Sequence, residues 1–199
     1  MNQVVQKFIE KNIELLDSNN FDKLYQKLRQ ETTPSDVAAL TEVLIAADID
    51  PLEYLTYVPE SFMEMSPHPW VPEMPQNIRY IAKFAFYASD VKDAIIPGHI
   101  KFIGDRAFEC CSELETLKIF HGCEELGECC FFDCNQLQNI ELPSSIKRID
   151  SYCFSGCEST DHINYIGTKQ QWEQIIKGKE LFLRGAIKQI ICSDGVLLV

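Results

Sequence analysis

The sequence lacks any long uninterrupted run of apolar residues. None of its apolar stretches approaches the roughly 20 residues that a membrane-spanning helix needs. The first sixteen residues, MNQVVQKFIEKNIELL, carry charges inside their apolar pattern and do not provide the apolar segment of a signal peptide. We therefore expect no membrane segment and no secretion, and we predict a cytoplasmic location.

The sequence also lacks the motifs of catalytic and cofactor sites. It has no H-E-x-x-H sequence and no glycine-rich phosphate loop. No nucleophile lies at motif spacing from any of its four histidines, which are His68, His99, His121 and His162. We predict that the protein is not an enzyme and uses no cofactor.

Basic side chains are few compared with acidic ones. The 199 residues include 18 lysines and arginines and 30 aspartates and glutamates, which gives a formal net charge of -12. This charge repels the phosphates of nucleic acids, so we expect no direct nucleic-acid binding. Two interpretations of the acidic surplus stay open, solubility alone and docking on a basic partner.

An internal repeat of 23 residues occupies the middle of the chain. Ile103, Leu126 and Ile149 follow one another at this interval, and a shorter copy, IRYIAKFAFYASDVKDAIIP, precedes them. Each copy has one short strand, such as LETLKI, that cannot bury both faces alone and must stack on its neighbours. Stacking at about 4.8 Å turns each repeated position into a column of side chains. The predicted aromatic column contains Phe86, Phe108, Phe131 and Phe154.

Five of the nine cysteines keep the step of the repeat. Cys111, Cys134 and Cys157 form one set, and Cys130 and Cys153 form another at the position that an alanine holds in the preceding copy. A position shared by alanine and cysteine requires a small apolar side chain. We predict that these thiols are free and fill space in the core.

Two chemical roles for cysteines compete with this interpretation. Cys130 with Cys134, and Cys153 with Cys157, have the spacing of zinc-ligand pairs, but stacking would place both pairs in a core without room for tetrahedral coordination. Four cysteines, Cys110, Cys123, Cys129 and Cys192, fall outside the repeat, and a redox role is the alternative for Cys110 and Cys129. Each of these two follows a glutamate, Glu109 or Glu128, and a neighbouring negative charge disfavours a thiolate.

The repeats share a longer pattern, I-x-x-I-G-x-x-A-F-x-x-C-x-x-L-x-x-L-x-I-P, seen in IKFIGDRAFECCSELETLKIF and IELPSSIKRIDSYCFSGC. Over about residues 78–166 this pattern resembles the BspA-like class of leucine-rich repeat. INYIGTKQQWEQI followed by ICSDG is similar to the segment that often closes such arrays. The resemblance implies a curved β/α solenoid that binds proteins and carries no catalytic residues. The chain departs from the pattern at Phe120, where proline is expected, and at Thr160, where leucine is expected.

The predicted fold class is α+β, with four parts. Residues 1–58 are a helical cap domain, 59–76 a linker with five of the nine prolines, 77–166 about four leucine-rich repeats, and 167–199 a C-terminal cap. The linker is interpreted as a segment laid across the edge of the solenoid. Its alternative role is a groove-binding peptide built on PHPW, Met63, Met65 and Met74.

Helical spacing predicts three amphipathic helices in the first part. Their apolar residues are Val5, Phe8, Ile9, Ile13 and Leu16, then Phe21, Leu24, Tyr25 and Leu28, then Val37, Leu40, Val43, Leu44 and Ala47. In the C-terminal cap, Thr168 and Gln171 form a predicted capping box, and Trp172, Ile175 and Ile176 share one helical face. The SDG turn that follows predicts a hairpin.

The residues between the buried positions of each strand face solvent and are candidates for partner binding. They are Asp93, Thr116, Lys118, Phe120, His121, Asn139, Glu141, His162 and Asn164. Two orientations of Phe120 stay open, an exposed anchor for a partner and an inward packing variant. A second candidate surface is an acidic rim of Glu109, Glu113, Glu115, Glu124, Glu125 and Glu128.

These features predict a non-catalytic intracellular module for protein–protein interaction. A narrower hypothesis is an inhibitor from a phage or mobile element that occludes a basic host protein such as a nuclease. The alternatives are a bacterial surface adhesin and a thiol- or zinc-dependent enzyme. The sequence leaves the partner and the oligomeric state open.

Overall fold

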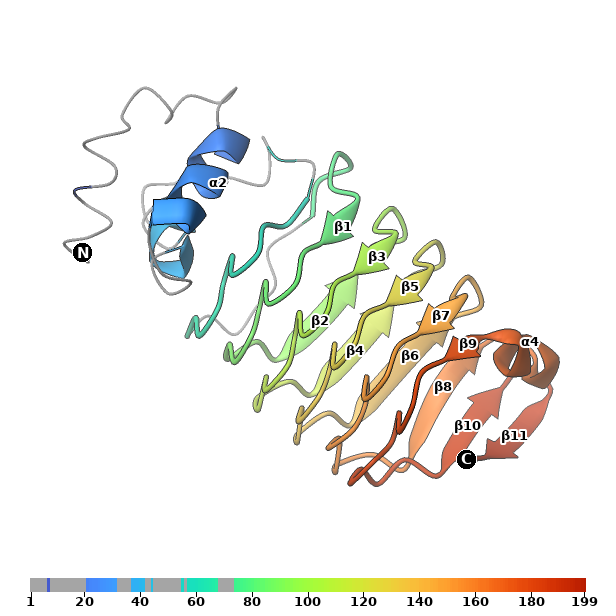
Figure 1. The fold of residues 1–199 in the computed structure, drawn as a ribbon. Coiled ribbons are helices and arrows are strands. Elements are labelled where there is room, and N and C mark those ends of the chain that lie inside the picture. Colours follow the sequence, from blue (N-terminus) through green and yellow to red (C-terminus); the bar gives the residue numbers. More distant parts are fainter. Residues whose placement is uncertain are drawn as a thin grey trace.

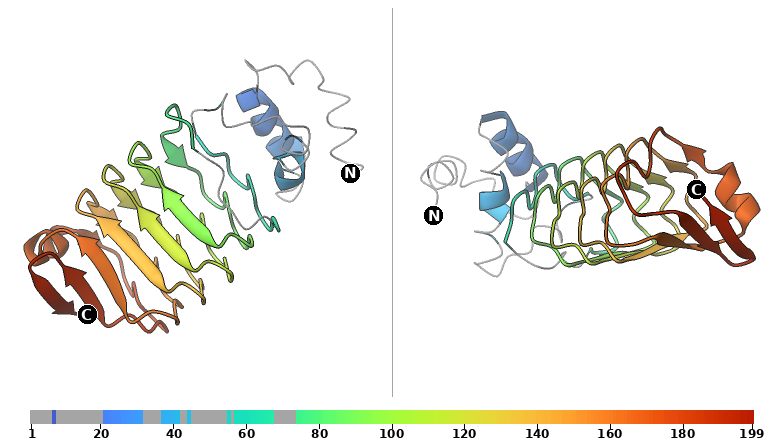
Figure 2. Two further views of the ribbon diagram at one scale, coloured as in Figure 1. Left: turned by 180° about the vertical axis from the view of Figure 1, so that it is seen from behind. Right: turned by 90° about the horizontal axis from the view of Figure 1, so that it is seen from below.

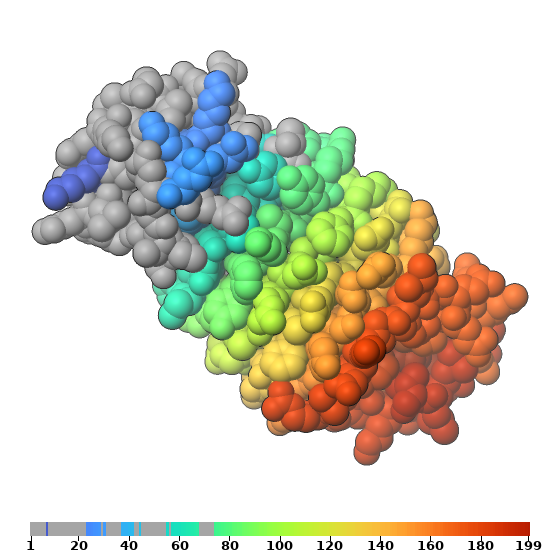
Figure 3. Space-filling view, in the orientation of Figure 1, coloured from blue at the N-terminus to red at the C-terminus, as the bar shows by residue number. Residues whose placement is uncertain are grey.

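The computed structural model describes residues 7, 21–31, 37–41, 44, 55, 57–67 and 74–199 (Figure 1). Its main body is a solenoid in which successive coils stack along one axis, and they appear as parallel bands in Figure 3. Most coils give one short strand to each of two sheets. No helix in the described part of the chain has the length and apolarity that crossing a bilayer requires.

The larger sheet has six strands and faces the viewer in the left panel of Figure 2. In spatial order they are β2 (Asp93–Ile96), β4 (Thr116–Ile119), β6 (Asn139–Pro143), β8 (His162–Ile166), β10 (Gln189–Cys192) and β11 (Gly195–Leu198). Neighbouring strands are parallel except β10 and β11, which are antiparallel. Buried and more exposed side chains alternate along β2, β4 and β8, because successive residues of a strand point to opposite faces.

The smaller sheet lies on the opposite side of the coils and has five parallel strands of two residues each (Figure 1). They are β1 (Tyr80–Ile81), β3 (Phe102–Ile103), β5 (Glu125–Leu126), β7 (Arg148–Ile149) and β9 (Ile176–Lys177). Gly127 shows how closely the coils approach each other beside this sheet. A Cβ at this glycine would lie 2.6 Å from the backbone nitrogen of Asp105 in the preceding coil.

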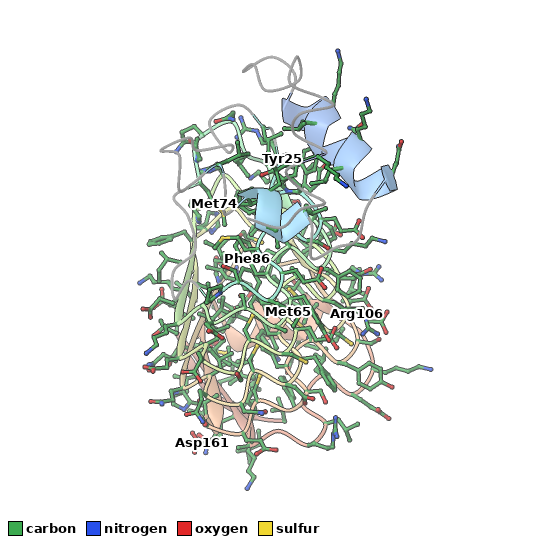
Figure 4. The ribbon with its side chains drawn as sticks, turned by 90° about the vertical axis from the view of Figure 1, so that its left-hand side faces the viewer. Tyr25, Met65, Met74, Phe86, Arg106 and Asp161 are labelled. Atoms are coloured by element: carbon green, nitrogen blue, oxygen red, sulfur yellow. The ribbon has the colours of Figure 1, made fainter. Side chains whose placement is uncertain are left out.

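A column of stacked phenylalanine rings fills the space between the sheets, as predicted. Phe86, Phe108, Phe131 and Phe154 are fully buried, and Figure 4 shows Phe86 inside the solenoid. Their ring centroids are 4.8, 5.3 and 5.6 Å apart in succession, and neighbouring rings are parallel within 13°. Residues that are one repeat apart in the sequence are therefore direct neighbours in the stacked core.

Turns replace the helices that a β/α solenoid would have, so this part of the fold prediction is wrong for the repeats. Between each strand of the smaller sheet and the next strand of the larger one, two residues four positions apart have positive φ. Examples are Arg106 with Cys110 and Cys129 with Asp133, with φ between 54° and 60°. A left-handed residue interrupts a right-handed helix, so these segments remain turns.

In the described part of the chain, six such pairs of left-handed residues mark six coils, two more than the sequence predicted. The first coil, with Ser61 and Met65, falls in the predicted linker, and the last, with Glu180 and Arg184, follows an inserted helix. Sequence comparison missed the first because Met63 stands where later coils have phenylalanine. Met63 is fully buried and donates its backbone N–H to Ala85. The groove-binding role is therefore wrong for Met63, and residues 68–70 of PHPW lie outside the described residues.

The N-terminal helices pack on the first coil. In α2 (Phe21–Glu31), Leu24, Tyr25 and Leu28 are buried as predicted, and the ring of Tyr25 lies 5.9 Å from that of Phe62. The Tyr25 hydroxyl is 2.8 Å from the Thr41 hydroxyl, which lies in the next helical segment. Val37, Leu40 and Leu44 of that segment are also buried. The apolar residues of the first predicted helix, together with Val43 and Ala47, lie outside the described residues.

The C-terminal segment contains the predicted helix and hairpin. Helix α4 (Lys169–Gln174) begins with the Thr168–Gln171 capping box, and Trp172 packs edge-on against Tyr165 with centroids 5.2 Å apart. The helix ends before Ile176, which is 64% exposed in β9, so the prediction that Ile176 shares one helical face with Trp172 and Ile175 is wrong. The hairpin β10–β11 extends the larger sheet by two strands.

Candidate functional site

The predicted partner-binding residues gather on the solvent-facing side of the six-stranded sheet, which we call the outer face. Strand register places seven of the nine in two columns that cross the strands at right angles, and Phe120 and His121 follow β4. The first column contains Asp93, Thr116, Asn139 and His162 and continues to Gln189. The second contains Lys118, Glu141 and Asn164 and has an isoleucine at each end, Ile95 and Ile191.

Phe120 points outward, which decides between the two orientations that the sequence left open. Its side chain is 47% exposed, directly after β4. The Lys118 ammonium lies 5.3 Å from the centre of its ring and 3.0 Å from the Glu141 carboxylate. A cation over an aromatic ring and a carboxylate beside it hold the three side chains together at β4 and β6 of the outer face.

The two predicted histidines occupy different positions. His162 lies in the first column, and its Nδ1 is 2.8 Å from the Asp161 carboxylate, a contact that lowers the pKa of Asp161. His121 is exposed beyond the end of β4, where the chain turns toward the smaller sheet. Thr160 is buried in place of the expected leucine, and its hydroxyl donates to the backbone oxygen of His162 at 3.0 Å.

Five exposed apolar residues of the outer face were missed in the sequence. Ile95, Ile166, Ile191 and Val196 are between 37% and 57% exposed, and Leu198 is 82% exposed. Ile95 could have been found, because it pairs with Lys118 and takes the same place in the repeat. The other four lie at the C-terminal end, where the repeat pattern fades. The outer face thus combines polar columns on β4, β6 and β8 with apolar positions on the strands at both ends.

The acidic residues do not form one rim, contrary to the second candidate surface. Glu115 precedes β4 of the larger sheet, whereas Glu125 begins β5 of the smaller sheet on the opposite side and Glu124 directly precedes it. Glu124 also forms an ion pair with Lys147 of the next coil. Glu109 is only 7% exposed.

The buried Glu109 is part of a polar cluster at the turns. Its carboxylate forms an ion pair with Arg106, whose guanidinium lies 3.1 Å away on the side of the turns (Figure 4). Burial raises the pKa of Glu109, and the positive charge of Arg106 opposes that increase. Burial also raises the pKa of Cys129 to about 11, although Arg106 lowers it. The sequence did not reveal this neighbouring cation, but the net shift still disfavours a thiolate.

The columns of cysteines serve packing. Cys111, Cys134 and Cys157 are buried, and each Sγ donates to the backbone oxygen of a phenylalanine in the preceding coil, at 3.0, 3.1 and 3.4 Å. Burial raises the pKa of Cys111 to about 12, so this thiol keeps its proton. Over the described residues, no group of three or more potential ligand side chains is arranged to hold a metal ion.

Replacement of one of these thiols tests the packing role. Ser89 occupies the position of Cys111 in an earlier coil, and its hydroxyl donates at 2.8 Å to the Phe86 oxygen of its own coil. We expect Cys134→Ser to change the free energy of unfolding by less than about 1 kcal/mol, because the hydroxyl replaces the S–H donor. Cys134→Val, which removes the donor, should cost about 1 kcal/mol more than the serine variant. Urea unfolding of both variants measures the difference, and equal costs would contradict a donor role for the thiol.

Comparison of the sequence with known families agrees with this geometry. The profile described as "BspA type Leucine rich repeat region (6 copies)" matches residues 60–182. The chain belongs to the BspA-type leucine-rich repeat family. The six copies agree with the six coils of the structure. Leucine-rich repeat proteins are generally non-catalytic and bind other proteins.

Solved structures with a similar fold include two leucine-rich repeat proteins from Bacteroides. The protein from Bacteroides capillosus is 24% identical with a TM-score of 0.43, over 45% of this chain and 64% of that one. The protein from Bacteroides ovatus is 22% identical with a TM-score of 0.40, over 61% and 42% of the two chains. The pneumococcal vaccine antigen PcpA is 20% identical with a TM-score of 0.40, over 60% and 23%. The matched region is therefore less than two thirds of each of these proteins, and no curated protein matches the chain.

Proposed function

We propose that this leucine-rich repeat protein binds a protein partner on the outer face of its six-stranded sheet. The observation that carries the proposal is Phe120, an aromatic side chain that is 47% exposed beside Lys118 and Glu141. Aromatic residues are enriched in the buried centres of protein interfaces, where a few anchors supply most of the binding energy. The polar residues of both columns then supply hydrogen bonds around this anchor.

The narrower form of the proposal is an intracellular inhibitor from a phage or mobile element, with a basic target such as a nuclease. It is supported by the net charge of -12 and by carboxylates on or beside the outer face. Asp161, next to the first column, has a lowered pKa and stays ionised at neutral pH. Acidic groups around an aromatic anchor complement a basic surface and speed the encounter with it.

Substitution of the anchor tests the binding site. We expect Phe120→Ala to weaken binding of the partner about 30-fold, the loss typical of an aromatic residue at the centre of an interface. Leu183→Ala is the matched control, because Leu183 is 45% exposed in the turns away from the outer face. The partner is first captured from the organism that carries the gene, and its affinity for each purified variant is then measured by calorimetry.

Two outcomes would contradict the proposal. If both variants bind as tightly as the original chain, the outer face is not the binding site. If the affinity is unchanged between 50 and 500 mM salt, roughly 14 and 4 Å in Debye length, the basic target is wrong while the outer face can still be right.

A further inference from the structure

Strand β11 has a free edge with hydrogen-bonding groups that the structure leaves unpaired in the described residues. The backbone N–H of Val199 donates to Lys188 at 3.0 Å, so this pair is hydrogen-bonded across β10 and β11. In an antiparallel pair, hydrogen-bonded positions alternate with non-bonded ones. Leu197 and Gly195 therefore bond to β10, and Val196 and Leu198 direct their N–H and C=O groups away from it. Figure 2 shows β11 as the outermost strand at this end of the sheet.

The side chains of the same two residues lie on the outer face. Register pairs Val196 with Ile191 and Leu198 with Gln189, and both partners belong to the columns of the outer face. Val196 is 49% exposed and Leu198 is 82% exposed. With Ile191 and Ile166, they form an apolar patch beside an open strand edge. Natural proteins usually protect such an edge with charges, proline or a bulge, and the sequence GVLL of β11 has none of these.

Charge distinguishes this end of the molecule from the rest. Residues 167–199 contain five basic and three acidic side chains, whereas every other part of the chain is net acidic. A second copy that docks at this end keeps the net acidic parts of the two chains far apart. The second copy also brings an identical strand.

We propose that two copies of the chain pair through their β11 strands, antiparallel and related by a twofold axis near Leu197. This register places Val196 opposite Leu198 of the second copy, and Leu198 opposite Val196. Both residues present their N–H and C=O groups to the edge, so the two pairs exchange four backbone hydrogen bonds. The six-stranded sheets then join into one sheet of twelve strands.

The same arrangement buries the apolar patch. Val196 and Leu198 of each copy face each other on the outer side of the joined sheet, next to Ile191 of both copies. The twofold axis also sets the two outer faces side by side, and the net acidic parts of the two chains lie at opposite ends of the dimer. The dimer would present two partner-binding faces on one surface.

The oligomeric state of the full chain tests this pairing. Sedimentation equilibrium of the 199-residue protein should give the mass of a dimer, and Leu198→Pro should give a monomer. Proline at position 198 removes an N–H that points to the free edge and leaves the bonds between β10 and β11 intact. Ile176→Lys is the control, because Ile176 is 64% exposed on β9 of the other sheet, and this variant should remain a dimer.

A second variant keeps the test valid if proline disturbs the hairpin. Val196→Lys places a charge at the paired edge without changing the backbone, and it should shift the dimer dissociation constant upward at least tenfold. Circular dichroism of each variant checks that the solenoid is folded. A monomeric original chain at 100 μM, or a Leu198→Pro variant that stays dimeric, would overturn the proposal.

Discussion

Phe131→Ala is expected to lower the free energy of unfolding by about 3–5 kcal/mol. Phe131 is fully buried in the middle of the aromatic column, with stacked rings 5.3 and 5.6 Å away on its two sides. The substitution leaves a cavity that the neighbouring coils cannot close, because their backbones are already in contact. Urea unfolding followed by circular dichroism measures the loss.

The expected loss of stability depends on the burial of the Phe131 ring and not only on the removal of a phenyl group. Phe120→Ala removes the same atoms from a side chain that is 47% exposed and should change stability far less. Each coil contacts mainly its neighbours, so the Phe131 cavity also separates the coils before it from those after it. A two-step unfolding curve would show that separation. Equal stability of the two variants would contradict a continuous core.

Arg106→Met should lower stability at pH 7 by about 2 kcal/mol. The side chain of Glu109 is 10% exposed and loses its counter-charge in this variant, whereas the arginine itself is 45% exposed. Removal of one partner from a fully buried pair costs about 3–5 kcal/mol, and the exposure of Arg106 to water reduces that cost. Methionine keeps the aliphatic part of the side chain, so the loss reports the charge. Thermal and urea unfolding measure it.

The loss should depend on pH in a defined direction. Burial raises the pKa of Glu109 in the folded state above its unfolded value, and removal of Arg106 raises it further. A carboxyl group with a raised folded pKa destabilises the protein above that pKa, and the penalty disappears as the pH falls below the unfolded value, about 4.5. The difference between Arg106→Met and the original chain should therefore shrink at pH 4.

A double variant isolates the charge. Adding Glu109→Gln to Arg106→Met should recover most of the stability at pH 7, because the amide carries no charge. Arg148→Met is the matched control, since Arg148 pairs with Asp150 on the exposed surface and should change little. A pH-independent loss in Arg106→Met would show that packing of the arginine, and not neutralisation of Glu109, stabilises the turn.

The stacked core could be predicted because its interval is written directly in the sequence. Phe108, Phe131 and Phe154 recur every 23 residues, and stacked coils require equivalent residues to meet. The first coil could not be found in this way. Its core positions hold Met63 and Ser66, which preserve burial but not residue identity. The first coil is shown by the family profile, which matches from residue 60, and by the positive φ angles of Ser61 and Met65.

The outer face could be predicted where a strand fixes the direction of its side chains. Alternation placed Lys118 and Glu141 on the solvent side because their neighbours are buried. Phe120 directly follows β4, and alternation continues to it, because Ile119 is buried and Phe120 is exposed. Its replacement of the expected proline left the inward variant open in the sequence, and the structure excludes that variant. The prediction of one acidic surface was wrong for a different reason. The chain leaves the larger sheet and enters the smaller sheet between Glu115 and Glu124.

The lengths of the coils show where this fold tolerates change. The step from Phe86 to Phe108 is one residue shorter than the others, yet Ala94 and Leu117 return to the 23-residue register in the next strand. The last coil holds the additional helix α4 and still aligns its strands with those before it. Additional or missing residues are thus accommodated in the turns between the strands, and the strands keep their register. Insertions at these turns therefore change the surface of the molecule in evolution without changing the spacing of the stacked core.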